Sequence, residues 1–481
     1  MSSAKEPVTR RFGNGLTVLI KEDKSHPVVS LQYWVGTGSM NEGHWQGSGL
    51  SHLLEHLVFK GTAHFSGQEL ARKVQERGGH WNAYTSVNRT VYYIDGPAES
   101  WQIFLNLLTE LVFFPTFPED EMEREKEVVR REMAMYADDP DSVAYQLLMQ
   151  TLYLKHPCRW PVLGERAAFD CLTRQDVLDY HASRYVPNNV VLSIAGDVDA
   201  AEILSHLELL VEDLKSRPLN REPIPHEPHQ FGSRRVRKEF AVPYSKLHLA
   251  WRLPCSAHPD TPALSALSSI LGGGRSARFY EKFHDRLGLV YSIEVHSNQS
   301  ETDEGAFTIS MDVDRAQRDK VRDMVLQELR NLAEEDFTED LKRVCKQTRV
   351  SRLRRRSSAS GVASEMGADW FGSRNLNLSS EWQEAIERVT TEDLHRVCST
   401  WLSSPNVTEV SLDPPGSNAG DEERASASAG TALSEHVLGN GMKVVIREDH
   451  RLPLAYACMA FKAGCLSLIH ISEPTRLALI S

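Results

Sequence analysis

Hydrophobic and polar residues alternate in several short segments of the chain, and a period of two is typical of half-buried strands. In the second half, Leu247, Leu249, Trp251 and Leu253 form one such series, and Phe307, Ile309, Met311 and Val313 form another. The first half has strand patterns near residues 17–20, 28–35, 90–95 and 190–195, and helical stretches near 315–334 and 339–356 follow the second series. We therefore predict an α+β fold of mainly antiparallel sheets, each packed against helices on one face.

Two segments rich in turn-forming residues divide the chain. Residues 217–228 read R-P-L-N-R-E-P-I-P-H-E-P, and these prolines resist both helix and sheet. Residues 414–433 contain Pro, Gly, Ser and Ala with almost no large apolar residue, which is typical of a linker. The breaks predict two similar domains, 1–216 and 229–413, followed by a linker at 414–433.

The chain also repeats itself. F-G-N-G-L-T-V-L-I-K-E-D at residues 12–23 matches L-G-N-G-M-K-V-V-I-R-E-D at residues 438–449, a constant offset of 426 residues. Each copy predicts a strand, a G-N-G turn and a second strand. We interpret residues 434–464 as the start of a second repeat unit in a tandem protein. Residues 465–481, CLSLIHISEPTRLALIS, depart from the first copy, and we expect them to be a non-native tail.

Charge and composition narrow the range of partners. The 481 residues include 54 basic and 66 acidic side chains, a net charge of −12, which argues against nucleic acid as the main ligand. No run of 18 apolar residues predicts a membrane span. The first residues, MSSAKEPVTRR, do not resemble a secretion signal. The location stays open between the cytoplasm, which the lack of such a signal favours, and export to the periplasm.

The segment G-L-S-H-L-L-E-H-L-V-F-K-G-T, residues 49–62, predicts a helix that carries chemistry. Its apolar positions, Leu50, Leu53, Leu54, Leu57 and Val58, follow the spacing of one buried helix face. His52 and His56 are one turn apart on the adjoining face, so both imidazoles can reach one metal ion, and Glu55 lies between them in sequence. This H-x-x-E-H order is the reverse of H-E-x-x-H. The alternative is two polar histidines at the edge of a surface helix.

A second predicted helix, residues 119–136, offers carboxylates as further ligands. Glu125 and Glu132 are seven residues apart and share one partly apolar face. Two unpaired carboxylates on such a face are costly to bury, and a metal ion would explain them. Spacing favours this pair over the other glutamates of the segment without choosing between its members. A solvated acidic helix is the alternative.

With these motifs, the sequence resembles the M16 metallopeptidases, the family of pitrilysin, insulinase and mitochondrial processing peptidase, over residues 8 to about 413. Further similar segments are G-G-H-W-N-A-Y-T-S at 78–86, M-Y-A-D-D-P at 135–140, L-G-G-G-R-S-A-R-F-Y at 271–280 and G-L-V-Y-S at 288–292. The resemblance implies the LuxS/processing-peptidase-like metallohydrolase fold and one Zn²⁺ in the catalytic domain. It implies that His52, His56 and Glu132 are the zinc ligands, Glu55 the general base and Glu125 a supporting carboxylate.

The family's substrate-binding residues also have counterparts here. The resemblance implies that Asn82, Ala83, Tyr84 and Thr85 receive the substrate backbone as an added strand. Many relatives place Arg seven residues before the Tyr of G-L-x-Y, and the pair holds substrate. Here Tyr291 is present but the earlier position is His284, which departs from the pattern.

The resulting functional hypothesis is a zinc-dependent endopeptidase that cuts peptides or unstructured segments with a water activated by zinc and Glu55. Members of the family close two halves around a chamber that holds the substrate. The expected partners are therefore peptide substrates and either a missing C-terminal half or a second copy that closes this chamber. The alternative is a non-catalytic binding or scaffold subunit of a processing-peptidase-like complex. Such subunits generally lack the zinc motif, so the intact motif favours the enzyme.

Overall fold

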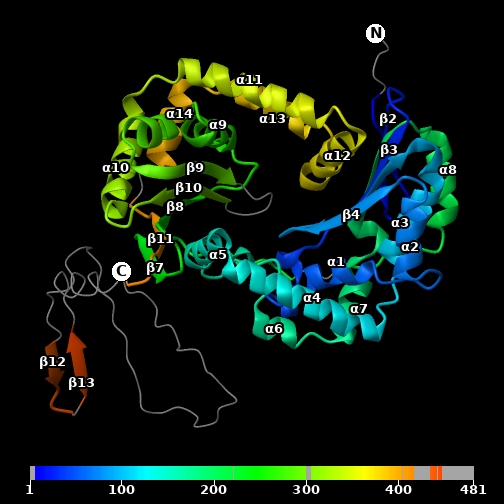
Figure 1. Ribbon diagram of the computed structural model, residues 1–481, viewed down its shortest axis with the longest axis horizontal. Helices are drawn as coiled ribbons and strands as arrows, with labels where there is room; N and C mark the ends of the chain where they lie inside the picture. The colour runs from blue at the N-terminus through cyan, green and yellow to red at the C-terminus, as the bar shows by residue number, and fades with distance from the viewer. Residues whose placement is uncertain are drawn as a thin grey trace. The chain divides into compact units, whose positions relative to one another are not determined.

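The computed structural model describes residues 6–219, 222–298, 305–402, 405–416, 434–440 and 442–446. The chain forms two compact units, residues 1–417 and residues 418–481. The first unit contains two sheets and their helices (Figure 1). No helix in the described ranges is long and apolar enough to cross a membrane.

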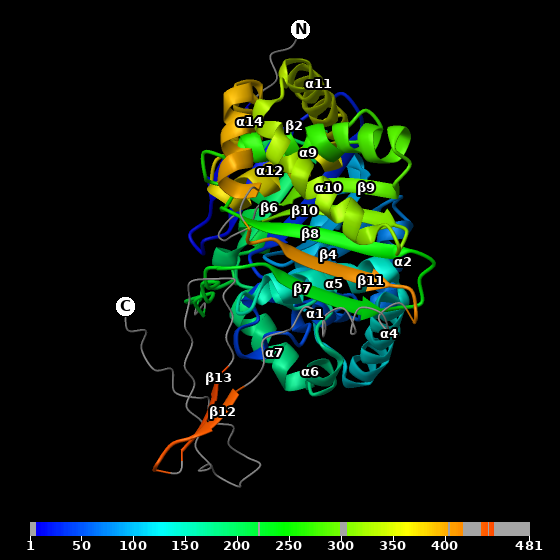
Figure 2. The same cartoon turned by 90° about the vertical axis from the view of Figure 1, so that its left-hand side faces the viewer.

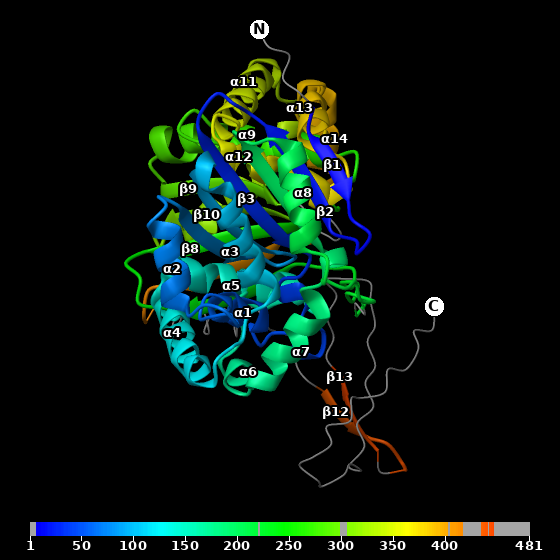
Figure 3. The same ribbon diagram turned by 90° about the vertical axis from the view of Figure 1, so that its right-hand side faces the viewer.

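The first sheet and its helices come from the N-terminal half of the first unit. Its strands are β1 (Val8–Arg11), β2 (Thr17–Glu22), β3 (Val28–Val35), β4 (His80–Thr85), β5 (Thr90–Pro97) and β6 (Val190–Gly196). Its helices are α1 (Leu50–Val58), α2 (Gly67–Gln75), α3 (Trp101–Phe113), α4 (Glu119–Asp138), α5 (Pro140–Leu152), α6 (Arg166–Asp170), α7 (Arg174–Arg184) and α8 (Ala200–Leu210). In Figure 3, α3 and α8 lie in front of β3 and β2.

The second sheet follows in the C-terminal half. Its strands are β7 (Arg234–Glu239), β8 (Ser245–Leu253), β9 (Val290–Asn298), β10 (Gly305–Val313) and β11 (Thr408–Asp413). Its helices are α9 (Thr261–Gly272), α10 (Arg318–Asn331), α11 (Thr338–Arg355), α12 (Ala359–Ser373), α13 (Leu378–Glu387) and α14 (Thr391–Val397). In Figure 2, β8, β11 and β7 succeed one another across this sheet.

The two sheets share one topology, except that the first has an additional edge strand, β1. The first has the order β1-β2-β6-β3-β5-β4 and the second the order β7-β11-β8-β10-β9. In each sheet the last strand in sequence pairs in parallel with an early strand, β6 with β2 and β11 with β7, and the remaining pairs are antiparallel. The prediction of an α+β fold with mainly antiparallel sheets is confirmed.

Each half contributes one helix to the sheet of the other half. Helix α12 packs on the first sheet, where Ala363 and Met366 contact a cluster that includes Trp34. Helix α5 packs on the second sheet, where Leu148 and Leu152 join a cluster with Ala250, Ala306 and Val410. Helices therefore cover both faces of each sheet, and the expectation of one covered face was wrong. In both halves the exchanged helix follows the long helix α4 or α11 in sequence.

The second unit is described only as a hairpin of β12 (Ser434–Val437) and β13 (Lys443–Ile446). In this hairpin Ser434 pairs with Ile446, and in the first hairpin Val8 pairs with Ile20. Ser434 and Ile446 lie 426 residues after Val8 and Ile20, which is the offset of the sequence repeat. The two hairpins therefore pair in the same register. The predicted tail at 465–481 lies outside the described residues.

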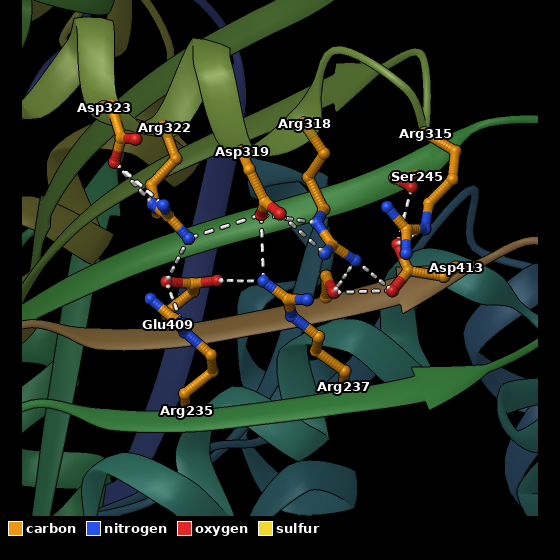
Figure 4. A network of polar contacts seen from close by, with 11 residues as sticks. Arg235, Arg237, Ser245, Arg315, Arg318, Asp319, Arg322, Asp323, Glu409 and Asp413 are labelled. Atoms are coloured by element: carbon orange, nitrogen blue, oxygen red, sulfur yellow. Dashed lines mark hydrogen bonds and ion pairs between the residues drawn. The ribbon is translucent and has the colours of Figure 1, made fainter. Parts of the chain in front are cut away.

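An ionic network ties α10 to the second sheet (Figure 4). Arg318 of α10 pairs with Asp413 at the end of β11, and both side chains are fully buried. Glu409 of β11 accepts from Arg235 of β7 at 2.9 Å and lies 3.5 Å from Arg322. The network satisfies carboxylates that would otherwise be buried unpaired.

Candidate metal centre

Helix α1 is fixed in place by its apolar face. All five of its predicted apolar residues are fully buried in the first core. The helix begins at Gly49, whose φ of +72° lies in the left-handed region, and a Cβ on this residue would come within 2.0 Å of the carbonyl oxygen of Leu163. A side chain at position 49 would therefore displace the start of α1. The polar face that carries His52, Glu55 and His56 is positioned as a rigid unit.

Helix α4 lies beside α1 and supplies the carboxylates (Figure 1). Glu125 is 6% exposed and Glu132 projects toward the histidines of α1. Their spacing of two helical turns puts both on the side of α4 that faces α1, as the sequence predicted.

The side chains of His52, His56 and Glu132 converge on one point. Glu132 Oε2 lies 3.8 Å from His52 Nε2 and 3.8 Å from His56 Nε2. One ligand atom from each residue lies within 4.8 Å of the other two, and no other group of three His, Cys, Asp or Glu in the described residues is arranged in this way. Two imidazoles and one carboxylate form a donor set that suits zinc and leaves one tetrahedral position free. The residues present therefore fit a zinc ion.

Burial sets the charge state of the donors. Burial, with a smaller contribution from His56, lowers the pKa of His52 to about 3, so this imidazole is neutral, as a metal ligand must be. Its Nδ1 is buried without a hydrogen-bond partner among the described residues, whereas its Nε2 faces Glu132. Burial also raises the pKa of Glu55, and a hydrogen bond from Thr85 partly offsets this rise.

Glu125 stands behind the histidines instead of between them. Its Oε2 lies 3.2 Å from His56 Nδ1, the ring nitrogen that points away from Glu132, and its Oε1 lies 2.6 Å from Lys60 Nζ. Burial acts to raise the pKa of Glu125, but the hydrogen bonds from His56 and Lys60 hold it below its usual value. Glu125 is thus an ionised partner of His56, and Glu132 is the carboxylate placed beside both Nε2 atoms.

Strand β4 is the outer strand of the first sheet, next to this centre. The Ser86 amide donates to the Arg89 carbonyl oxygen, which makes Ser86 and Arg89 a hydrogen-bonded pair of the β4–β5 hairpin. Because such pairs alternate along an antiparallel ladder, the backbone groups of Trp81, Ala83 and Thr85 point to the open edge. At that edge the Ala83 N–H donates a 2.9 Å hydrogen bond to Asn82 Oδ1.

A cavity of about 690 Å³ opens beside the centre. His52, Thr85 and Glu132 form part of its wall, and apolar or aromatic side chains of α4, α5 and residues 161–164 form most of the rest. Lys238 of β7 reaches the same cavity from the second half. The space next to the candidate metal centre is therefore bounded by both halves of the first unit.

Tyr291 and His284 lie in the second half and have separate neighbours. Tyr291 is 56% exposed on β9, and its ring centroid is 5.2 Å from that of Tyr244. His284 stacks on Tyr280 at 4.3 Å. Tyr291 does not line the cavity beside His52, so a role for it in substrate binding stays a prediction.

Three residues of the site were not recognised in these roles from the sequence. Thr85 donates to Glu55 Oε2 at 2.5 Å, Lys60 pairs with Glu125, and Lys238 reaches the cavity. Lys60 follows His56 by four residues, a spacing that could have placed it one turn away on the same side. No local pattern could have found Thr85 or Lys238 in these roles, because each contact joins separate elements.

Comparisons with known proteins identify the family of this chain. The description "Insulinase (Peptidase family M16)" matches residues 17–166, and the description "Peptidase M16 inactive domain" matches residues 172–347. The chain belongs to the M16 peptidase family. The resemblance noted in the sequence is thereby confirmed. The first match lies within the first half, and the second begins just before α7 of the first half and continues into the second half.

Relatives of this M16 chain carry the name zinc protease. An uncharacterized zinc protease of Mycobacterium tuberculosis is 30% identical over 299 residues, which cover 61% of this chain and 67% of that protein. One from Rickettsia felis is 27% identical over 406 residues, which cover 82% of this chain and 94% of that protein. The crystal structure of a protease from Helicobacter pylori has a TM-score of 0.78 and 26% identity, and the match covers 85% of this chain and 99% of that one.

Proposed function

We propose that this M16 chain is a zinc-dependent endopeptidase that hydrolyses peptides or unstructured polypeptide segments. The observation that carries the proposal is the convergence of His52, His56 and Glu132 around one point, with Glu55 on the same helix face. A zinc ion held by this donor set supplies a Lewis acid that polarises a carbonyl group and makes water more acidic.

Glu55 is the proposed general base. Its carboxylate accepts a proton from the attacking water as the new carbon–oxygen bond forms. It then delivers that proton to the leaving amine as the carbon–nitrogen bond breaks, so the carboxylate is regenerated. The hydrogen bond from Thr85 to Oε2 fixes the orientation of the carboxylate and leaves Oε1 for the proton.

Strand β4 is the proposed docking site for the substrate backbone. Its open edge offers the backbone N–H and C=O groups of Trp81 and Ala83 and the C=O group of Thr85, whose N–H interacts with Glu55. An extended peptide can pair with such an edge without regard to its side chains. The Asn82 side chain that now holds the Ala83 amide would have to yield to such a peptide. Because the substrate backbone must be extended to pair with β4, unstructured segments are better substrates than folded proteins.

A second copy of the first unit is the proposed partner that closes the chamber. The matches to relatives from Rickettsia felis, Bacillus subtilis and Rickettsia bellii cover 94%, 92% and 96% of those proteins, so each of these relatives is about one unit long. The hairpin that repeats the first register supports the alternative, in which a linked second unit plays this part.

Cleavage of an unstructured peptide by metal-free and zinc-loaded protein tests the proposal. We expect turnover only with zinc, and we expect Glu55→Gln to keep stoichiometric zinc while losing turnover by a factor of at least about 100, the range of general-base catalysis. Glu123→Gln, on an exposed part of α4, is the matched control and should behave like the parent. Zinc binding without cleavage would instead favour a scaffold role, and cleavage by Glu55→Gln at the parental rate would remove Glu55 as the base.

A further inference from the structure

A line of charged contacts runs from Lys60, just after α1, to the candidate metal centre. Lys60 Nζ lies 2.6 Å from Glu125 Oε1, and Glu125 Oε2 lies 3.2 Å from His56 Nδ1. The other ring nitrogen, His56 Nε2, lies 3.8 Å from Glu132. Each oxygen of Glu125 thus has its own partner, Lys60 at Oε1 and His56 at Oε2.

We infer that Lys60 is a positioning residue of the zinc site: its ammonium group orients the Glu125 carboxylate, which in turn orients His56 with Nε2 toward the metal. This inference rests on the proposed function. It assigns to Lys60 a part in metal binding although its side chain does not contact the metal ligands.

Burial makes the orientation depend on Lys60. The Glu125 side chain is 8% exposed, so water cannot replace a lost partner at Oε1. Among the described residues, Lys60 is the one lysine or arginine that pairs with this carboxylate. Without the ammonium group the buried carboxylate loses the partner that fixes Oε1, and the position of the acceptor for His56 Nδ1 is no longer set.

The backbone around Lys60 is itself held in place. Gly61 forms an isolated bridge with Ser66 directly after Lys60. A Cβ on Gly67 would come within 2.5 Å of the Phe59 carbonyl oxygen and 3.2 Å of Lys60 Cα, so this glycine lets the two segments touch. The lysine therefore reaches Glu125 from a fixed base, which is what a residue that positions another side chain requires.

Zinc affinity, measured by competition with a chromophoric chelator, tests the inference without any activity measurement. Partners of metal-binding histidines typically contribute a factor of about 10 to 100 in affinity, and we expect Lys60→Met to lose that much while Lys60→Arg stays within about threefold of the parent. Lys155→Met is the matched control on an exposed site and should leave affinity unchanged. The thermal midpoint of the metal-free variants shows whether each one folds.

The double variant separates a route through Glu125 from a direct effect. If Lys60 acts through Glu125, then Glu125→Gln and Lys60→Met/Glu125→Gln have the same zinc affinity within about threefold. Parental affinity in Lys60→Met overturns the inference, and so does a double variant that is much weaker than Glu125→Gln. If the parent protein itself binds no zinc, the proposed function fails together with this inference, whereas zinc-dependent cleavage by a Lys60→Met protein of parental affinity removes the inference alone.

Discussion

The Thr85 hydroxyl donates a 2.5 Å hydrogen bond to Glu55, and this contact joins the edge strand β4 to helix α1. Thr85 also presents its backbone C=O group to the open edge of the first sheet. One residue therefore contacts both the proposed general base and the proposed path of the substrate backbone. Docking of a peptide on β4 would be coupled directly to the position of Glu55.

Thr85→Val should reduce kcat without loss of zinc. A hydrogen bond to a charged group contributes about 1.5–3 kcal/mol, so its removal should lower kcat about 10- to 100-fold. Valine keeps the shape and strand preference of threonine but cannot donate to Glu55. Steady-state kinetics and metal analysis check this expectation, and Thr85→Ser should retain most activity. A Thr85→Val protein with parental kcat would show that Glu55 needs no such restraint.

The sequence predicted those parts of the site that depend on local periodicity. The leucine spacing of α1 fixes which face joins the core, and this in turn puts His52 and His56 together on the adjoining face. The seven-residue spacing placed Glu125 and Glu132 toward α1 but did not say which one joins the histidines. That choice depends on the crossing of two helices, which side-chain packing decides and sequence spacing does not.

The exchange of α5 and α12 could not be predicted for the same reason. The contact of Met366 with Trp34 joins residues in different halves, and the pattern of each helix says only that it has an apolar face. Strand β3, in contrast, is an almost continuous apolar run, V-V-S-L-Q-Y-W-V, which is the pattern of a strand buried on both faces. The sequence of β3 therefore indicated that both faces of this strand are covered, but it did not indicate which helix covers the second face.

Gly367→Ala should weaken the contact between the two halves. Alanine normally stabilises a helix relative to glycine by roughly 0.5–1 kcal/mol. On α12, however, the added Cβ would lie 2.3 Å from Trp34 Cε2, and overpacking of this kind costs about 1–3 kcal/mol. We expect a lower thermal midpoint and faster hydrogen exchange in α12. Gly13→Ala, which has no heavy atom within 4 Å of its new Cβ, is the control, and a stabilised Gly367→Ala protein would contradict this packing.

Arg318→Met should destabilise the second half strongly. The substitution removes the closest cation from the buried Asp413, which keeps two hydroxyl donors, Ser245 at 2.6 Å and Ser411 at 3.0 Å. The other nearby cation, Arg315, lies 3.9 Å away and is partly exposed (Figure 4). Breaking a buried ion pair by removing one partner costs about 3–5 kcal/mol. Urea unfolding should report this loss, and Arg318→Met/Asp413→Asn should recover part of it because no buried charge remains unpaired.

An exposed pair provides the comparison for Arg318. Arg388 and Glu384 are 3.3 Å apart, and their side chains are 72% and 69% exposed. Arg388→Met should therefore change the free energy of unfolding by less than about 1 kcal/mol. Equal effects of Arg318→Met and Arg388→Met would mean that the network of Figure 4 contributes no more than surface charges.

Glu42→Gln should change how stability depends on pH. Glu42 is fully buried, accepts a 2.8 Å hydrogen bond from the Ser51 amide in the first turn of α1, and burial raises its pKa to about 8. Between about pH 4.5 and 8 the folded state then binds more protons at this site than the unfolded state does. Stability contributed by the protonated carboxyl group is therefore complete below pH 4.5 and is lost as the pH rises toward 8.

Glutamine cannot ionise, so the variant avoids this loss. Urea unfolding of metal-free protein at pH 5 and pH 8 should show the stability of Glu42→Gln rising relative to the parent by more than about 1.4 kcal/mol, the equivalent of one pKa unit. The metal-free state removes the pH dependence of zinc binding itself. Glu119→Gln, at an exposed position of α4, should leave the difference between the two pH values unchanged. If the stability of Glu42→Gln relative to the parent is the same at both pH values, the carboxyl group that supports the start of the zinc helix does not titrate in this range.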